Sequence, residues 1–468
     1  MVSLAAALKS SFYVTLARGY YLALRIVFVL LLVAVIGPEA YGRYSYAQSW
    51  YVFLIPLALW GGNELVISRY LKTDAALRND FAGSILSVRL LLGCIGVAVI
   101  AGFAIATEPD AALRQLMLVY STGLLIRSVI AWLSAMFLAV GKGSRFFWVS
   151  VAFLTVEVVL VLGLAVSERS LLVIASAQVG VWLATMVVMA AVHLARSISV
   201  LPRWDSDYVR QFLKDGLEVG LANFCMYGVS PCLLLLFRHG GSSTDLGSVA
   251  LATTGFMILL QISVRVSNAL LPAFGTEVHE PANKPWGFLR ASLIYSVGLI
   301  GMLSTSASFF LSPLLADSGL GRLEDPLTLV LRYLWLTAPI LLFACLRMYL
   351  INERYYRTLL VSTCGGLLTA IAWFSAHKGS DVATPLVAMA AGFITMTLFA
   401  LLRQRELLRG SPSPMQPIGV VFVTSAFVVV VSEGAGASLV LLGFYWTAAA
   451  VYATRELRGL RARLLQST

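Results

Sequence analysis

Arginines inside long apolar stretches are the residues of this sequence whose type and spacing suggest chemistry. Arg25 lies near the centre of the first apolar run, and Arg18 precedes it by seven residues, so a helix would place both side chains on one face. Arg127 lies in the middle of the fourth run. Because an arginine at the centre of a bilayer costs about 2.5–3.5 kcal/mol on insertion scales, Arg25 and Arg127 are expected to face a solvated interior.

A set of buried arginines favours an anionic ligand. The guanidinium group binds phosphate oxygens through two parallel hydrogen bonds, so arginines around one chamber indicate a phosphate or diphosphate. For the shallower Arg18 and Arg89, the side chain could instead reach phospholipid headgroups at the membrane surface. The predicted diphosphate ligands are Arg18, Arg25, Arg89, Arg127 and Arg265.

Glu157, in the fifth run, is the acidic residue nearest mid-membrane. Its carboxylate could neutralise Arg127 or Arg25 in an ion pair, or it could bind the ion whose gradient drives transport. Three amide side chains in apolar turns are expected to line a polar cavity or to bond between helices. These are Asn63, Gln261 and Asn268.

The sequence carries no sign of catalysis, of a cofactor or of a metal site. It has no zinc-protease, phosphate-loop, dinucleotide or nucleophile-elbow motif, and its five cysteines lack metal-ligand spacing. No predicted loop much exceeds fifteen residues, so a soluble catalytic domain has no room. We therefore do not expect an enzyme.

Composition places these residues in a membrane protein. The chain of 468 residues is 59% hydrophobic and 12% charged, with a mean hydropathy of +0.86. A helix needs about 20 apolar residues to cross the hydrocarbon layer, and about fourteen such runs are found. They predict an all-α polytopic fold. The runs are residues 12–36, 44–70, 82–106, 114–140, 146–166, 171–196, 211–238, 248–272, 287–315, 327–350, 357–377, 382–403, 418–432 and 437–454.

The loop charges predict the orientation of the spans. With the N-terminus inside, twenty lysines and arginines fall on inner segments and six on outer loops. Basic residues beside spans are retained on the cytoplasmic side, so both termini are expected in the cytoplasm and the chain in the cytoplasmic (inner) membrane. The net charge of +11 therefore reflects topology, and membrane lipids rather than nucleic acid are the expected partners.

A weak internal repeat predicts how the spans are grouped. At an offset of 205 residues, Gly42 aligns with Gly247, and Asn63 with Asn268. The repeat favours two six-helix lobes related by a pseudo-two-fold axis along the membrane normal. The lobes would be residues 1–200 and 201–410, followed at 411–468 by an extra two-helix hairpin and a basic cytoplasmic tail.

The segment 36–47, with the sequence IGPEAYGRYSYA, resembles the first outer loop of bacterial polysaccharide flippases. These O-antigen type transporters belong to the multidrug, oligosaccharidyl-lipid and polysaccharide exporter superfamily. The resemblance implies transfer of an undecaprenyl-diphosphate-linked oligosaccharide from the cytoplasmic to the periplasmic leaflet by alternating access. It also implies a role in O-antigen, capsule or exopolysaccharide biosynthesis, coupling to a proton or sodium gradient, and a polysaccharide polymerase as partner. The fourteen predicted spans are similar to the lipid II flippases of that superfamily, whereas O-antigen flippases usually have twelve.

Two other functions remain open at the level of sequence. A multidrug or cation exporter of the same fold would favour an acidic cavity, and the excess of intramembrane arginine argues against it. A membrane polymerase or ligase acting on lipid-linked glycans would need a long outer loop.

Overall fold

The computed structural model describes residues 4–74, 76–140, 142–194, 201–238, 243–275, 337–377 and 381–403. Every regular element in these ranges is an α-helix, and eight of the helices are long and apolar enough to cross a membrane. The predicted all-α, multi-pass membrane fold is confirmed. The number of fourteen spans stays a prediction, because the runs at 287–315, 418–432 and 437–454 lie outside the described residues.

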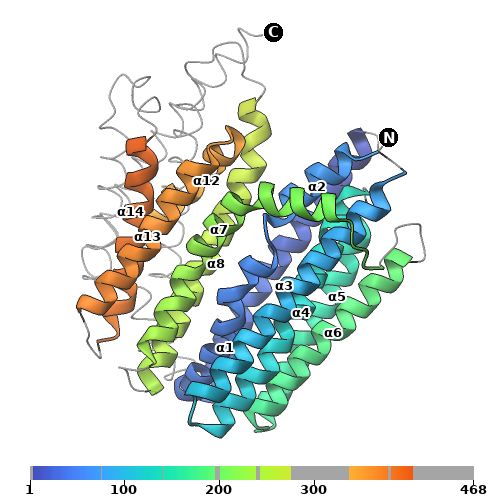
Figure 1. The fold of residues 1–468 in the computed structure, drawn as a ribbon. Helices are drawn as coiled ribbons and strands as arrows, with labels where there is room; N and C mark the ends of the chain where they lie inside the picture. Colours follow the sequence, from blue (N-terminus) through green and yellow to red (C-terminus); the bar gives the residue numbers. More distant parts are fainter. Residues whose placement is uncertain are drawn as a thin grey trace, which may run out of the picture. The chain divides into compact units, whose positions relative to one another are not determined.

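The first element, α1 (Leu4–Ala58), contains a reversal of the chain at Gly37. A continuous helix of its 55 residues would extend for about 80 Å, far more than the hydrocarbon core of a bilayer. Gly37 has φ 83° and ψ 162°, a backbone conformation that only glycine adopts readily. Arg25, twelve residues before Gly37, hydrogen-bonds to Gln48, eleven residues after it. The two arms therefore pack antiparallel, and the turn separates the first two predicted spans (Figure 1).

The second predicted span, 44–70, is not one continuous helix. Its helical part ends at Ala58, and a separate short helix, α2 (Gly62–Lys72), follows after a three-residue turn. Gly61 and Gly62 have φ values of 73° and 77°. The prediction of a single span was wrong here, because two successive left-handed glycines interrupt the helical hydrogen bonds.

The turn between α1 and α2 packs against α7 (Ser206–Phe237). The indole Nε1 of Trp60 donates a 2.9 Å hydrogen bond to the carbonyl of Leu213. A methyl group added to Gly216 would lie 2.7 Å from the Trp60 ring, so glycine is what lets the turn approach the helix. Packing against α7 therefore stabilises the interruption of the second span.

In addition to α7, five further helices lie between residues 78 and 275. Helices α3 to α6 run alongside α1, and α4 also packs against α3 and α6 (Figure 1). They are α3 (Arg78–Thr107), α4 (Ala111–Ala139), α5 (Gly143–Val166), α6 (Leu171–Leu194) and α8 (Ser243–Gly275).

The chain forms two compact units. The first is Met1–Ala250 with Phe374–Pro385, and the second is Leu251–Trp373 with Leu386–Thr468. The lobe boundaries that the repeat predicts, at residues 200 and 410, stay predictions.

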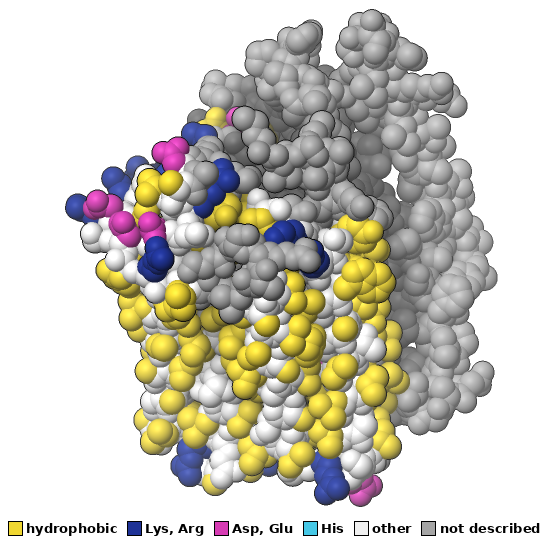
Figure 2. Space-filling view, turned by 90° about the vertical axis from the view of Figure 1, so that its right-hand side faces the viewer, with side chains coloured by type: hydrophobic (Ala, Val, Ile, Leu, Met, Phe, Trp, Pro, Cys, Tyr) yellow, Lys and Arg dark blue, Asp and Glu magenta, His cyan; other side chains and the backbone are white. Residues whose placement is uncertain are grey.

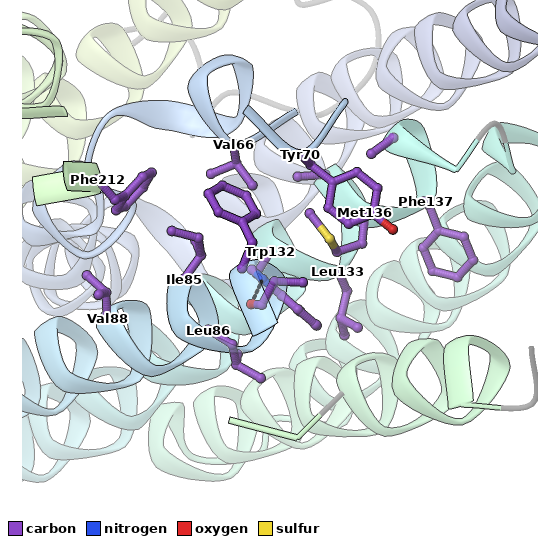
Figure 3. Close-up of a cluster of buried hydrophobic side chains, with 14 of the residues drawn as sticks. Val66, Tyr70, Ile85, Leu86, Val88, Trp132, Leu133, Met136, Phe137 and Phe212 are labelled. Atoms are coloured by element: carbon purple, nitrogen blue, oxygen red, sulfur yellow. Dashed lines mark hydrogen bonds between the residues drawn. The ribbon is translucent and has the colours of Figure 1, made fainter. Parts of the chain in front are cut away.

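An apolar core fastens α2 across the ends of α3 and α4. Val66 and Tyr70 of α2 meet Ile85 of α3 and Met136 of α4 in a cluster of buried side chains (Figure 3). Within it, Trp132 donates a 3.1 Å hydrogen bond through its indole nitrogen to the carbonyl of Ala82. The polar atom of the largest side chain is thereby satisfied, which lets the tryptophan stay buried.

Charged side chains lie at the two ends of the first unit, and Figure 2 shows hydrophobic side chains covering the face between them. At one end Arg203 pairs with Asp80, and its backbone nitrogen donates to the Gly83 carbonyl at 3.2 Å. At the other end Arg43 pairs with Asp110 at 3.6 Å. Loops that the charge pattern assigns to one side therefore meet at one end of this unit. Which end is cytoplasmic stays a prediction.

In the second unit, α13 (Tyr356–Ala376) and α14 (Ala383–Arg403) approach closely through glycines. A methyl group on Gly366 would lie 2.6 Å from the carbonyl oxygen of Gly392, and one on Gly392 would lie 2.9 Å from the carbonyl oxygen of Gly366. Small residues at such contacts let membrane helices pack by direct backbone contact. The remaining helix of this unit is α12 (Thr337–Asn352).

We predict that Gly366→Ala destabilises the protein by about 1–3 kcal/mol, because the added methyl must push two backbones apart. The measurement is the apparent melting temperature of purified protein in detergent. Gly365→Ala is the matched control on the same helix, since its methyl would meet only Phe399, at 3.6 Å. Equal melting temperatures for the two variants would contradict the close packing.

Candidate functional site

A polar cluster lies in the middle of the first unit, where α1, α4, α5 and α6 meet. Arg25 is twelve residues before Gly37, Tyr120 nine after the start of α4, and Glu157 nine before the end of α5. At 1.5 Å per residue, these positions are roughly 14–18 Å from the same end of the helices, near the middle of a ~30 Å hydrocarbon layer. The cluster comprises Arg25, Tyr44, Gln48, Tyr51, Tyr120, Arg127, Glu157, Gln178 and Trp182.

One half of the cluster links the two arms of α1 to α4. The Nη2 of Arg25 donates to Oε1 of Gln48 at 3.3 Å. The Nε2 of Gln48 faces the hydroxyl oxygen of Tyr44 at 2.8 Å and that of Tyr120 at 3.3 Å. Because Gln48, Tyr44 and Tyr120 are buried, these polar groups must satisfy one another.

The other half of the cluster leads to α5 and α6. The hydroxyls of Tyr44 and Tyr120 donate to Oε1 of Gln178 at 2.7 and 2.8 Å, and Nε2 of Gln48 also lies 3.1 Å from this oxygen. The Nε2 of Gln178 then donates to Oε1 of Glu157 at 2.7 Å. A continuous chain of hydrogen bonds therefore connects Arg25 with Glu157.

Glu157 also forms an ion pair with Arg127. Its Oε2 lies 3.8 Å from Nη2 of Arg127, and the Arg127 guanidinium lies over the ring of Trp182, 4.1 Å from the centroid. The Glu157 side chain is 6% exposed and that of Arg127 is 27% exposed. A buried carboxylate needs cations and donors to replace its lost hydration, and Arg127 and Gln178 supply them. The ion-pair alternative of the sequence thus describes the observed contact, and a role in ion coupling stays a prediction.

Aromatic rings enclose the cluster. Tyr51 stacks on Tyr120 with a centroid separation of 6.0 Å and meets the Trp182 ring edge-on at 5.5 Å. Arg25 lies over Phe28, 5.2 Å from its centroid. The rings keep the guanidinium groups partly desolvated while their quadrupoles stabilise the positive charge.

The structure places Arg89 and Asn63 in a different polar group. Arg89 is fully buried, and its Nη2 donates to Oδ1 of Asn63 at 3.0 Å and to the Leu59 carbonyl at 3.4 Å. Its observed contacts hold together the turn between α1 and α2. A role of Arg89 and Asn63 in substrate binding stays a prediction.

The remaining predicted site residues are described only in part. The side chains of Arg18, Arg265 and Asn268 lie outside the described residues. Gln261 is half-buried on α8, in the second unit. Their predicted roles are untested.

Sequence reasoning missed Gln48, Gln178 and Trp182. Each glutamine lies within a predicted apolar span, which was the available signal. Their contact with Glu157 and Arg25 depends on which helix faces they occupy, and spacing alone did not show this.

The comparisons with known proteins establish the fold. No protein family matches the chain, and no curated protein is similar to it in sequence. Among solved structures, the chain resembles the lipid II flippase MurJ in an inward closed conformation, with a TM-score of 0.66, 10% identity, and coverage of 97% of this chain and 99% of that one.

Two multidrug transporters are also similar. An inward-facing multidrug resistance MATE family transporter of the MOP superfamily has a TM-score of 0.57 at 12% identity, covering 85% of this chain and 95% of that one. The eukaryotic MATE transporter AtDTX14 has a TM-score of 0.56 at 13% identity, covering 90% and 100%. The chain therefore shares its fold with these solved transporter structures.

We predict that Glu157→Ala destabilises the protein by about 2–4 kcal/mol, because it leaves Arg127 and the Gln178 amide without their partner. Thermal unfolding in detergent measures the effect. Glu168→Gln removes the same charge from the exposed turn after α5 and should leave the melting temperature unchanged. If both variants behaved like the wild type, the ion pair would have no structural role.

Proposed function

We propose that the chain is a flippase that carries a polyprenyl-diphosphate-linked oligosaccharide from the cytoplasmic to the periplasmic leaflet by alternating access. The observation that carries the proposal is the cluster around Arg25 and Arg127. It holds two guanidinium groups and one carboxylate at mid-membrane depth, so its formal charge is positive. Such a site attracts an anion.

The partial exposure of both arginines supports binding. Arg25 is half-buried, and 27% of the Arg127 side chain is exposed. A guanidinium group exposed at this depth contacts water, lipid or a ligand. Contact with acyl chains is energetically unfavourable, so water or a ligand is favoured. A diphosphate offers several oxygens to two guanidinium forks, and its charge is opposite in sign to the surplus charge of the cluster.

The fold supports transport of an amphipathic substrate. One structural neighbour is named as a lipid II flippase, and two are named as multidrug transporters of the same superfamily. The excess of positive charge in the cluster favours the anionic lipid-linked substrate over a drug cation. In this proposal the arginines bind the diphosphate, the sugars occupy a wet cavity, and the lipid tail stays in the bilayer.

The other parts of the proposal follow from the sequence. Arg18, Arg89 and Arg265 would add contacts to the diphosphate, and a second set, Asn63, Gln261 and Asn268, would contribute polar groups to the cavity. Glu157 would couple transport to a proton or sodium gradient. The protein would act in the inner membrane with both termini in the cytoplasm, for O-antigen, capsule or exopolysaccharide biosynthesis, and would deliver its cargo to a polymerase.

We predict that Arg25→Ala and Arg127→Ala each abolish surface polysaccharide, because each removes one of the guanidinium forks for the diphosphate. Surface glycan is measured in cells that depend on this gene, and membrane fractions are blotted to verify that the variants are inserted. Arg169→Ala is the matched control, since Arg169 is exposed in the turn between α5 and α6.

Normal glycan in both cluster variants would exclude this anion site. Extrusion of a lipophilic dye cation by the wild type, with no effect of its loss on glycan, would identify a drug exporter instead.

A further inference from the structure

The two ends of the hydrogen-bond chain fix the direction of every bond in it. Arginine has donors and no acceptor, so Gln48 must present Oε1 to Arg25 and turn Nε2 away. An ionised carboxylate only accepts, so Gln178 must present Nε2 to Glu157 and turn Oε1 away. Between the glutamines, each tyrosine hydroxyl therefore accepts from Gln48 and donates to Gln178.

Burial makes this polarity cooperative. Gln178 and Tyr120 are 0% exposed, Tyr44 is 1% exposed and Gln48 is 6% exposed. A buried donor that faces another donor loses its hydrogen bond without regaining water, so one group in the chain cannot reverse alone. The orientation at the Glu157 end therefore determines the orientation at the Arg25 end.

Protonation of Glu157 conflicts with this polarity. Its Oε2 faces Arg127, which has only donors, so the added proton belongs on Oε1, the oxygen that faces Gln178. The resulting hydroxyl is a donor facing the Nε2 donor of Gln178. The conflict is removed when Gln178 turns its amide over and accepts through Oε1.

The reversal then passes to Arg25. The turned Gln178 donates to the tyrosine hydroxyls, these rotate to donate toward Gln48, and Gln48 turns over to accept. Its Nε2 then faces Arg25, donor against donor, and that hydrogen bond is lost. One proton is taken up from water by Glu157; every other proton stays on its own residue, and no covalent bond between heavy atoms changes.

We propose that Gln48 and Gln178 are positioning residues that transmit the protonation of Glu157 to Arg25, so that Arg25 is held while Glu157 is ionised and released for an anionic ligand when Glu157 is protonated. Arg127 loses its ion pair in the same step, so one proton releases both guanidinium groups. The identity of the ligand as a diphosphate rests on the proposed function, whereas the release of Arg25 does not.

The other groups around Glu157 are compatible with this role. From α1, the side chains of Arg25, Tyr44 and Tyr51 lie near enough to interact with its charge, and from α4 Arg127 pairs with it. Helix α6 contributes Gln178 and Trp182, which do not titrate. Tyr21 lies near Arg25 at the other end of the hydrogen-bond chain.

A first test reads the release of Arg25 without any ligand. In Glu157→Gln the new amide should turn its oxygen to Arg127 and its nitrogen to Gln178, which imitates the protonated acid. Phenylglyoxal labelling of Arg25 in the full-length protein, followed by mass spectrometry at one pH, should be several-fold faster in this variant than in the wild type. Adding Gln48→Glu, whose carboxylate holds Arg25, should restore the wild-type rate.

Equal labelling of Arg25 in the wild type and in Glu157→Gln would overturn the inference, even if the proposed function stands. Labelling of Arg43, which pairs with Asp110 at the end of the unit, is the internal control and should not change. Because these variants are nearly isosteric with the wild type, their size-exclusion peaks should keep the wild-type elution volume and width.

A second test reads ligand binding. In lipid nanodiscs, Glu157→Gln should bind a polyprenyl diphosphate about tenfold more tightly than the wild type at pH 8, a typical magnitude for two coupled sites. Gln48→Met frees Arg25 at every pH and should bind more tightly than the wild type at pH 8. Adding Gln48→Glu to Glu157→Gln should weaken binding again, whereas adding Tyr44→Phe to Glu157→Gln should keep the tighter binding, because Tyr120 and the direct contact between the glutamines remain.

Opposite effects of the two Gln48 variants distinguish the relay from a merely structural role, which would weaken binding in both. Weaker binding by Gln48→Met than by the wild type at pH 8 would overturn the relay. A wild type that prefers the diphosphate no more than the matching polyprenol would overturn the proposed function, and the labelling test would still decide whether Arg25 is released.

Discussion

The cost of placing a guanidinium group in the middle of a bilayer governs the structure of the first unit. Arg25 and Arg127 each need partners that hydrocarbon cannot supply. Arg25 obtains them from Gln48, and Arg127 from Glu157 and the face of Trp182. Once these partners are buried, their own polar groups must be satisfied, and the requirement extends to four helices. The polar cluster is the result.

Glycines make the helical arrangement around this cluster possible. Gly37 lets the chain reverse sharply, so that Arg25 and Gln48 lie at the same depth on antiparallel arms. Gly61 and Gly62 interrupt the second span where it meets Gly216 of α7. In each case the absence of a side chain, through backbone freedom or close approach, sets the path of a helix.

The proposed flippase needs a site whose affinity for its substrate changes during the cycle, and a cluster with a buried carboxylate and two arginines would suit this need. In that proposal, the attraction between Glu157 and Arg127 would compete with a bound anion for the charge of Arg127. The ion pair of Arg43 with Asp110 at the end of the unit differs from this one in exposure, because its side chains are 43% and 29% exposed. Gln48 and Gln178 matter to the cluster as much as the charged residues do, because they connect Arg25 with Glu157.

The sequence by itself determined the class of fold and the charged residues whose burial in the membrane requires polar partners. Apolar runs of the right length predicted the transmembrane helices, and the depth of Arg25, Arg127 and Glu157 in those runs predicted a polar centre, because both follow from local composition and the cost of burying charge. Only the tertiary structure decided which side chains meet. It joined Gln48 and Gln178 to the charged residues and grouped Arg89 with Asn63, because such contacts depend on how helices far apart in the chain rotate and pack, and on where glycines let the backbone turn. Spacing along one helix carries no information about the face of another.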